Sequence, residues 1–241
     1  MRLSSFAGTD VGLARSGNED SFLRGRTVFA VADGLGGHQG GEVASAMAIE
    51  PVAALDGRAF ADAAEAAEAL AGAVAEANRA ILERAREDRA LWGMGTTLTA
   101  AAVAAGRLLQ LAHVGDSRAY LLRGGELRQL TEDHTVVAEA VTRGLLTRAQ
   151  AAVHPQRGVV TRAVGLDPGL LVDTPAPLEL EAGDQVLLCT DGLTEAVEEA
   201  RIAEVLAGEA DGDGACRALI AAANEAGGPD NVTVVLLRVG D

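Results

Sequence analysis

Short runs rich in Val, Leu and Thr alternate along the chain with longer segments in which apolar residues recur at helical spacing. The short runs are of strand type and occupy 27–32, 96–105, 108–114, 118–122, 185–190 and 232–239. From Leu70 to Ile81 apolar residues recur every three or four positions, which predicts a long amphipathic helix over 62–88. Further helices are predicted at 42–55, where Pro51 should kink or end the helix, at 199–206 and at 214–226.

The order of these predicted elements favours a layered α+β domain. The strands 108–114 and 118–122 are separated only by Gly115-Asp116-Ser117, and the first two predicted helices are consecutive. Strands that follow strands and helices that follow helices are typical of α+β folds and not of doubly wound α/β folds. Between about 135 and 160 the pattern weakens, and we predict a flap of short helices there.

Composition narrows the class of protein further. With 241 residues, 49% of them hydrophobic, the chain suits one fairly large domain or two small ones with a substantial core. The net charge of −15 argues against nucleic acid or an anionic membrane as the main partner. Cys189 and Cys216 follow no disulfide pattern, and neither a signal peptide nor an unbroken apolar span is evident. These features favour a cytoplasmic protein without a membrane anchor in this chain.

Four aspartates occupy equivalent places in the sequence, because each lies next to one end of a predicted buried strand. Asp33 and Asp191 directly follow such runs, Asp116 comes two residues after 108–114, and Asp230 precedes 232–239. A single Asp-Gly pair is most often a turn, but strands of one core can bring four carboxylates together. Carboxylates that face one another acquire raised pKa values unless a cation neutralises them. Oxygen ligands without cysteine predict Mg²⁺ or Mn²⁺ and not zinc.

A second polar segment lies near the N-terminus, where 10–20 reads D-V-G-L-A-R-S-G-N-E-D. By itself Arg15 would be a surface charge and Glu19 a solvated acid. Beside a metal cluster, Arg15 becomes a candidate phosphate-binding residue, because a guanidinium matches two phosphate oxygens at once.

A series of short motifs follows in order along the chain. They are R-S-G-N-E-D at 15–20, V-A-D-G-L-G-G-H-Q-G-G-E-V-A-S at 31–45, G-T-T at 95–97, H-V-G-D-S-R-A-Y at 113–120, L-T-E-D-H-T at 130–135, T-R-A-V-G at 161–165, C-T-D-G-L at 189–193 and G-P-D-N-V-T at 228–233. The ordered set, from about Ser5 to Val239, resembles the metal-dependent protein phosphatases of type 2C in their bacterial form. The resemblance implies a four-layer fold, a central antiparallel β-sandwich flanked by helix pairs, as one catalytic domain over 1–241.

The resemblance also implies a set of metal ligands for two Mn²⁺ or Mg²⁺ ions. Asp33 would bridge both ions, the Gly34 carbonyl would bind the first, and the second would be bound by Asp191 and Asp230.

Further ligands would lie around this pair of ions. Glu19 and Asp20 would act at or just beyond the directly bound ligands, partly through water. Asp116, together with Asp191, would hold a third and weaker ion. Arg15 matches the arginine that binds phosphate in this family.

The implied reaction is hydrolysis of phosphoserine and phosphothreonine in proteins. Two ions that share a water lower its pKa, and the bridging hydroxide attacks phosphorus in line with the departing oxygen. The ions and Arg15 stabilise the charge that develops on the phosphoryl oxygens. No phosphoenzyme is needed, so neither Cys189 nor Cys216 is expected to act as a nucleophile.

The residue that protonates the departing oxygen is left open. Eukaryotic members carry a histidine directly after the Asp-Gly pair, whereas Leu35 stands there in this chain. His38, three residues later, could donate the proton or simply hydrogen-bond the glycine-rich turn. His113 is expected in the core, and His134 and His154 are expected to be structural or flap residues.

Three functions fit these motifs. The leading one is a monomeric bacterial phosphatase that acts on phosphorylated proteins, including serine/threonine kinases, and reverses kinase signalling. The alternatives are a phosphatase that switches a sigma-factor regulator and an inactive relative used as a binding module. The complete aspartate set and the lack of a sensor region favour the first. The flap arginines Arg143, Arg148 and Arg157 could then hold residues that flank the phosphate, although singly each resembles a solvated loop charge.

Overall fold

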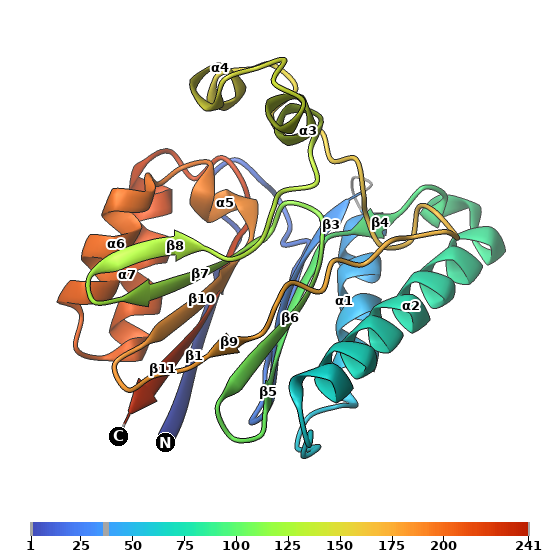
Figure 1. The fold of residues 1–241 in the computed structure, drawn as a ribbon. Helices are drawn as coiled ribbons and strands as arrows, with labels where there is room; N and C mark the ends of the chain where they lie inside the picture. The colour runs from blue at the N-terminus through green and yellow to red at the C-terminus, as the bar shows by residue number, and fades with distance from the viewer. Residues whose placement is uncertain (1, 36–38, 241) are drawn as a thin grey trace.

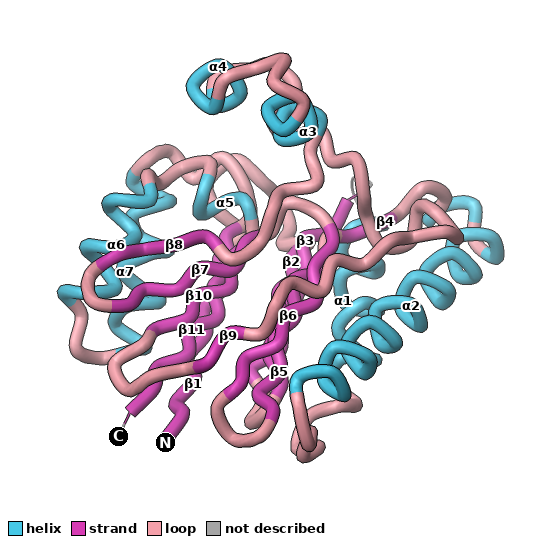
Figure 2. The backbone as a smooth tube through the Cα atoms, in the orientation of Figure 1, coloured by secondary structure: helices cyan, strands magenta, loops and turns pink. Residues whose placement is uncertain are grey.

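Two antiparallel sheets face each other in the computed structural model, which describes residues 2–35 and 39–240 (Figure 1, Figure 2). The first sheet contains, in spatial order, β1 (Arg2–Asp10), β11 (Val232–Gly240), β10 (Gln185–Cys189), β7 (Arg118–Arg123) and β8 (Glu126–Gln129). The second contains β2 (Asp20–Arg24), β3 (Val28–Leu35), β5 (Leu98–Ala104), β6 (Leu108–Val114) and β9 (Leu178–Glu179). The short strand β4 (Gly95–Thr96) pairs with β3.

Helices cover the outer face of each sheet, which gives the predicted four layers (Figure 1). The second sheet is covered by α1 (Gln39–Ala53) and α2 (Ala63–Glu87), and the 3-10 helix η1 (Arg89–Leu91) follows α2. The first sheet is covered by α6 (Glu199–Gly208) and α7 (Gly212–Glu225), with α5 (Asp191–Thr194) at its edge. The predicted flap contains α3 (Val136–Thr142) and α4 (Arg148–Ala152), which stand away from the sandwich (Figure 1).

Apolar side chains fill the spaces between all four layers. Phe29, Val31, Leu121, Leu188 and Val235 belong to the cluster between the two sheets. Separate clusters lie between each sheet and its own helices. Because the central strands are buried on both faces, they are apolar almost throughout, and full burial of each such side chain stabilises the fold by about 1.5–3 kcal/mol.

Most predicted boundaries agree with the observed ones to within a few residues. The long predicted helix corresponds to α2, whose first turn is capped by Asp62, since its carboxylate accepts a hydrogen bond from the Glu65 N–H. Pro51 lies inside the last turn of α1. Across residues 2–35 and 39–240, no helix combines the length and the apolar character that a membrane span needs.

Candidate active site

Strand pairing brings the predicted aspartates to one edge of the sandwich. β10 and β11 are antiparallel neighbours, so Asp191, just after β10, and Asp230, just before β11, lie at the same end. In the other sheet, Asp20 on β2 is the register partner of Asp33 on β3. Asp116 follows β6, whose end pairs with the start of β5 beside the same edge.

These strand ends border a pocket of about 150 Å³. The lining residues are Arg15, Glu19, Asp33, Gly34, Leu35, Asp116, Gly158, Val160, Asp191, Asp230 and Asn231. Apart from Asp20 and the flap arginines, the pocket therefore unites all the predicted site residues within the described part of the chain. Asp20 does not line the pocket, and its carboxylate accepts a hydrogen bond from the Thr190 hydroxyl at 2.9 Å. His38, the candidate proton donor, falls outside the described residues.

The carboxylates of the pocket are hard to ionise together. Burial, followed by the negative charges of Asp191 and Asp20, raises the pKa of Asp33 well above its usual value. Burial is also the main cause that raises the pKa of Asp116 to about 8, of Asp20 to about 7 and of Asp191 to about 6. A cluster with such pKa values needs protons or cations to neutralise it near pH 7.

The donor set fits hard divalent ions. Asp191 Oδ1 and Asp20 Oδ1 are buried and have no hydrogen-bond partner, and both belong to the acidic cluster. Every candidate ligand is an oxygen, which suits Mn²⁺ or Mg²⁺. Within residues 2–35 and 39–240, no three Asp, Glu, His or Cys side chains already surround a common point as metal ligands. The carboxylates line the pocket, and ion binding would have to draw their oxygens together.

Arg15 lies in the pocket and contacts a predicted metal ligand. Its Nη2 lies 2.5 Å from Asp230 Oδ2, and this hydrogen bond is the main cause that raises the pKa of Arg15. The guanidinium thus supplies the positive charge beside Asp230 that a metal ion would otherwise supply. Binding of a cation by Asp230 would release Arg15 for an anionic group, so the assignment of Arg15 to phosphate stays a prediction.

Asn231 is a buried residue of the site that the sequence did not single out. Its Oδ1 accepts a hydrogen bond from the Glu19 N–H at 2.8 Å. Its Nδ2 donates to the carbonyls of Val11 and Gly17 at 2.8 and 2.9 Å, so one amide holds the loop that carries Arg15. The signals in the sequence are the neighbouring Asp230 and the motif at 228–233 that contains Asn231, but neither reveals these partners, which lie more than 200 positions away.

Close backbone packing explains two of the glycines beside the aspartates. A Cβ at Gly34 would collide with the carbonyl of Gly41, and a Cβ at Gly192 would collide with the carbonyl of Asn231. The Asp-Gly pairs at 33–34 and 191–192 therefore let a strand end approach a neighbouring segment at the pocket.

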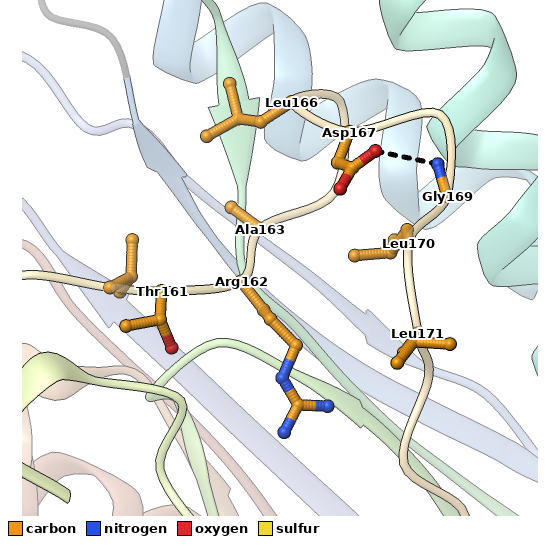
Figure 3. A pocket seen from close by; sticks show the side chains of 9 residues that line it. Thr161, Arg162, Ala163, Leu166, Asp167, Gly169, Leu170 and Leu171 are labelled. Atoms are coloured by element: carbon orange, nitrogen blue, oxygen red, sulfur yellow. Dashed lines mark hydrogen bonds between the residues drawn. The ribbon is translucent and has the colours of Figure 1, made fainter. Parts of the chain in front are cut away.

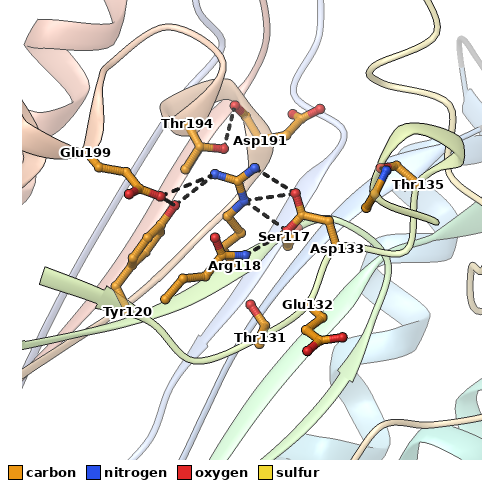
Figure 4. A network of polar contacts seen from close by, with 12 residues as sticks. Ser117, Arg118, Tyr120, Thr131, Glu132, Asp133, Thr135, Asp191, Thr194 and Glu199 are labelled. Atoms are coloured by element: carbon orange, nitrogen blue, oxygen red, sulfur yellow. Dashed lines mark hydrogen bonds and ion pairs between the residues drawn. The ribbon is translucent and has the colours of Figure 1, made fainter. Parts of the chain in front are cut away.

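Arg118, only two residues after Asp116, is engaged in a separate polar network (Figure 4). Its Nε and Nη2 donate to the carboxylate of Asp133 at 2.6–3.1 Å, and its Nη1 donates to the Tyr120 hydroxyl at 2.9 Å. Tyr120 in turn donates to Glu199 at 3.1 Å. This network holds β7 to the segment before the flap and leaves little positive charge for Asp116.

The histidines within the described part of the chain have structural contacts. His113 is buried, with Nδ1 2.9 Å from the Thr99 hydroxyl and Nε2 3.0 Å from the Glu132 carbonyl, and burial lowers its pKa to about 4. His134 Nδ1 accepts from the Gly115 N–H at 3.0 Å, and its Nε2 lies 3.0 Å from Asp173. The prediction of a core role for His113 is confirmed.

The flap borders the pocket through Gly158 and Val160. Its predicted substrate-binding arginines do not line the pocket. Arg143, directly after α3, pairs with Glu139 at 3.1 Å, and Arg157 pairs with Glu195 at 3.1 Å. Arg148 is exposed at the start of α4.

Comparison with known proteins identifies the family. The family model for protein phosphatase 2C matches residues 15–217. The chain is 44% identical to the serine/threonine protein phosphatase PstP of Mycobacterium tuberculosis over 98% of its own length and 45% of the relative's. It is 38% identical to the serine/threonine phosphatase stp of Listeria innocua, over 95% of the chain and 93% of that protein. The chain thus spans about half the length of PstP and nearly all of the Listeria protein.

Solved structures agree with the predicted fold. The crystal structure of M. tuberculosis PstP superposes with a TM-score of 0.93 at 42% identity, covering 99% of both chains. The PstP catalytic domain in complex with two manganese ions superposes with a TM-score of 0.88 at 40% identity, again over 99% of both chains. Together with the motifs and the acidic pocket, these similarities show that the chain belongs to the protein phosphatase 2C family.

Proposed function

We propose that this chain hydrolyses phosphoserine and phosphothreonine in proteins with the help of two Mn²⁺ or Mg²⁺ ions. The observation that carries the proposal is the convergence of Asp33, Asp116, Asp191 and Asp230 with Arg15 on one pocket. With Glu19, five carboxylates and one arginine line this net negative pocket, which is a poor binding site for phosphate until cations enter it.

The acidic residues divide between the ions as follows. Asp33 would contact both ions, the Gly34 carbonyl would contact the first, and Asp191 and Asp230 would contact the second. Asp116 would support a third and weaker ion with Asp191. When bound, the ion pair supplies charge neutralisation and a bridging hydroxide that attacks phosphorus in line. The PstP catalytic domain in complex with two manganese ions, at 40% identity, supports a site for two ions in this chain.

Further residues of the chain prepare the pocket for its substrate. Glu19 and Asp20 would act at or just beyond the directly bound ligands, partly through water. Arg15, once separated from Asp230, would donate to two phosphoryl oxygens and stabilise the charge that develops on them. Asn231 keeps this arginine loop in place through its three hydrogen bonds.

The biological role follows from the relatives. Of the bacterial relatives of this length, the Listeria protein is described as a serine/threonine phosphatase and a Streptococcus pneumoniae protein as a protein phosphatase, and their similarity supports a role in reversing serine/threonine kinase signalling. We expect phosphorylated proteins, including kinases, as partners, and a monomeric enzyme.

Hydrolysis of p-nitrophenyl phosphate tests the proposal. We expect turnover with Mn²⁺ or Mg²⁺ and none in excess EDTA, with recovery when Mn²⁺ is restored. A phosphothreonine peptide should behave in the same way. Full activity after thorough chelation, or no activity with any divalent ion, would refute the two-ion proposal.

A further inference from the structure

A second pocket lies next to the candidate active site and shares a wall with it. It has a volume of about 240 Å³ and is lined by Val160, Thr161, Arg162, Ala163, Leu166, Asp167, Gly169, Leu170 and Leu171 (Figure 3). Val160 lines both pockets. Whatever extends from the acidic pocket past Val160 therefore reaches the second pocket next.

The loop that forms this pocket is held in shape by polar contacts. Asn78, buried on α2, accepts a hydrogen bond from the Gly165 N–H at 2.6 Å and donates to the Asp167 carbonyl at 2.8 Å. The Asp167 carboxylate accepts from the Gly169 N–H at 2.8 Å, which closes the turn (Figure 3). The pocket is thus largely pre-formed, as ligand pockets commonly are.

The pocket offers mainly apolar surface, and its charged lining residues are Arg162 and Asp167. Ala163 is buried and Leu170 packs on the core under α2, whereas Leu166 and Leu171 are exposed, Leu171 to 71%. Arg162 is held by Asp173 at 2.6 Å, so its charge is already paired. Leucines exposed at the rim of a pre-formed pocket are typical of a contact site.

We infer that this pocket binds an apolar side chain of the phosphoprotein substrate, at a residue close in sequence to the phosphoserine or phosphothreonine. The inference rests on the proposed function. The volume of the pocket is below the 300–1,000 Å³ or so that is usual for a whole small-molecule ligand. A pocket of this size suits a single side chain. An extended peptide advances about 3.3 Å per residue, so one of the first few residues beyond the phosphorylated one can pass Val160 and enter.

The occupant follows from continuity with the active site. A phosphoprotein whose phosphate lies among Asp33, Asp116 and Asp191 must lay its flanking chain over the walls of that pocket. At the Val160 wall the next surface is apolar, so an apolar flanking residue gains burial there and a charged residue loses hydration.

A double-mutant cycle between enzyme and peptide tests the inference. The substrates are phosphothreonine peptides with one leucine at successive positions on either side of the phosphothreonine, in a serine and glycine background, together with the all-serine parent. Wild-type protein should hydrolyse one of the leucine peptides with a kcat/KM roughly tenfold above that of the parent. In Leu171→Ser this preference should fall to about threefold or less, and in Leu171→Ala to an intermediate value.

Leu145→Ser is the matched control. Leu145 is also 71% exposed, and it lines neither of the two pockets. This variant should retain the full preference of the wild type for the leucine peptide. Any general effect of a substitution on folding or on the metal site changes hydrolysis of the leucine peptide and of the all-serine parent alike. Such an effect cancels in the ratio of the two kcat/KM values.

The possible failures are distinguishable. Equal hydrolysis of all peptides by wild-type protein, or an unchanged preference in Leu171→Ser, would overturn the apolar subsite and leave the proposed phosphatase function intact. A change in sedimentation of Leu171→Ser with an unchanged preference would assign the pocket to a contact between copies of the chain instead. Absence of Mn²⁺-dependent hydrolysis of p-nitrophenyl phosphate would defeat the proposed function itself.

Discussion

The strand β10 has an aspartate just beyond each of its ends, and the two carboxylates have opposite surroundings. Asp184, 2% exposed, accepts hydrogen bonds from Arg123 Nε and Nη2 at 2.8 and 2.6 Å and from the Glu181 N–H at 2.8 Å. Burial by itself would raise the pKa of Asp184, but these contacts outweigh it and lower the pKa. At the other end, burial raises the pKa of Asp191 to about 6, and its Oδ1 has no hydrogen-bond partner.

The difference separates a structural carboxylate from a candidate ligand. At the Asp184 end, the chain itself supplies the cation and the amide that a buried carboxylate needs. At the Asp191 end, the nearby Arg118 is bound to Asp133, and Arg15 is paired with Asp230. Both ends of β10 have an aspartate shielded from water. The incomplete set of hydrogen-bond donors and cations around the Asp191 carboxylate is what marks that end, the cleft end, as a site for ions.

The largest expected effect is loss of turnover at the cleft end. Asp33→Ala or Asp191→Ala should lower kcat for p-nitrophenyl phosphate by several orders of magnitude, because both residues are proposed to hold the ions that generate the nucleophile. Asp184→Ala, at the other end of β10, should keep kcat per folded molecule near the wild-type value. Near-normal kcat in Asp191→Ala at saturating Mn²⁺ would erase the distinction between the two ends.

For the free energy of unfolding, we expect Asp184→Ala to have a larger effect than Asp33→Ala or Asp191→Ala. Asp184→Ala leaves Arg123 and the Glu181 N–H without their partner, which should cost about 2–4 kcal/mol of unfolding free energy and lower Tm by roughly 5–10 °C. The control is Glu179→Ala, which breaks the exposed pair with Arg107 and should cost less than about 1 kcal/mol. Thermal unfolding followed by circular dichroism measures both, and equal Tm values would contradict the structural role of Asp184.

The pH dependence of stability tests the contrast between Asp184 and the aspartates of the acidic pocket without any substitution. In the unfolded chain all these aspartates titrate near pH 4. Because the folded pKa values are raised to about 6, 7 and 8 for Asp191, Asp20 and Asp116, the folded metal-free protein binds more protons than the unfolded chain between about pH 4 and pH 8. The stability linked to these groups is full below pH 4 and is lost as pH rises through the folded values.

Thermal unfolding in EDTA should therefore give a higher Tm at pH 5.5 than at pH 8.5. Asp184 contributes in the opposite sense, since its lowered pKa adds stability that is lost only as pH falls below about 4. Added Mn²⁺ should raise Tm more at pH 8.5, because ions then replace protons at the cleft. A Tm that rises with pH in EDTA would show that the cleft carboxylates are partnered after all.

The sequence predicted the central strands well and the edge strands poorly. β3, β6, β10 and β11 are buried on both faces, so each leaves an apolar run that reads directly as a strand. β1 and β2 were missed, because they are outer strands of their sheets, only partly buried and rich in polar residues. Their pairing depends on β11 and β3, which no local pattern records.

The candidate site was predicted in its residue types but not in its contacts. The position of four aspartates at strand ends was enough to expect one acidic pocket. That Arg15 contacts Asp230, and that Asn231 holds the Arg15 loop, depends on residues more than 200 positions apart. Asp184 gave no signal either, because its partner Arg123 lies on a strand 61 positions earlier.

The smallest expected effect concerns the exposed arginines of the flap, which contrast with the half-buried Arg123. Arg143 and Arg157 are exposed and already paired with glutamates, so each can transfer only part of its charge to a phosphoprotein. Such contacts are worth about 0.2–1 kcal/mol each. Replacing Arg143, Arg148 and Arg157 by Gln should thus lower kcat/KM for phosphopeptides by between about threefold and about a hundredfold, with a smaller loss for p-nitrophenyl phosphate. The loss should shrink as salt rises, because exposed charges are screened.

The matched control replaces Arg201 and Arg217, which lie on α6 and α7, are exposed and are paired with acidic residues. This control should leave kcat/KM unchanged for both substrates. An equal loss on both substrates would show that the flap shapes the acidic pocket and does not bind the flanking residues.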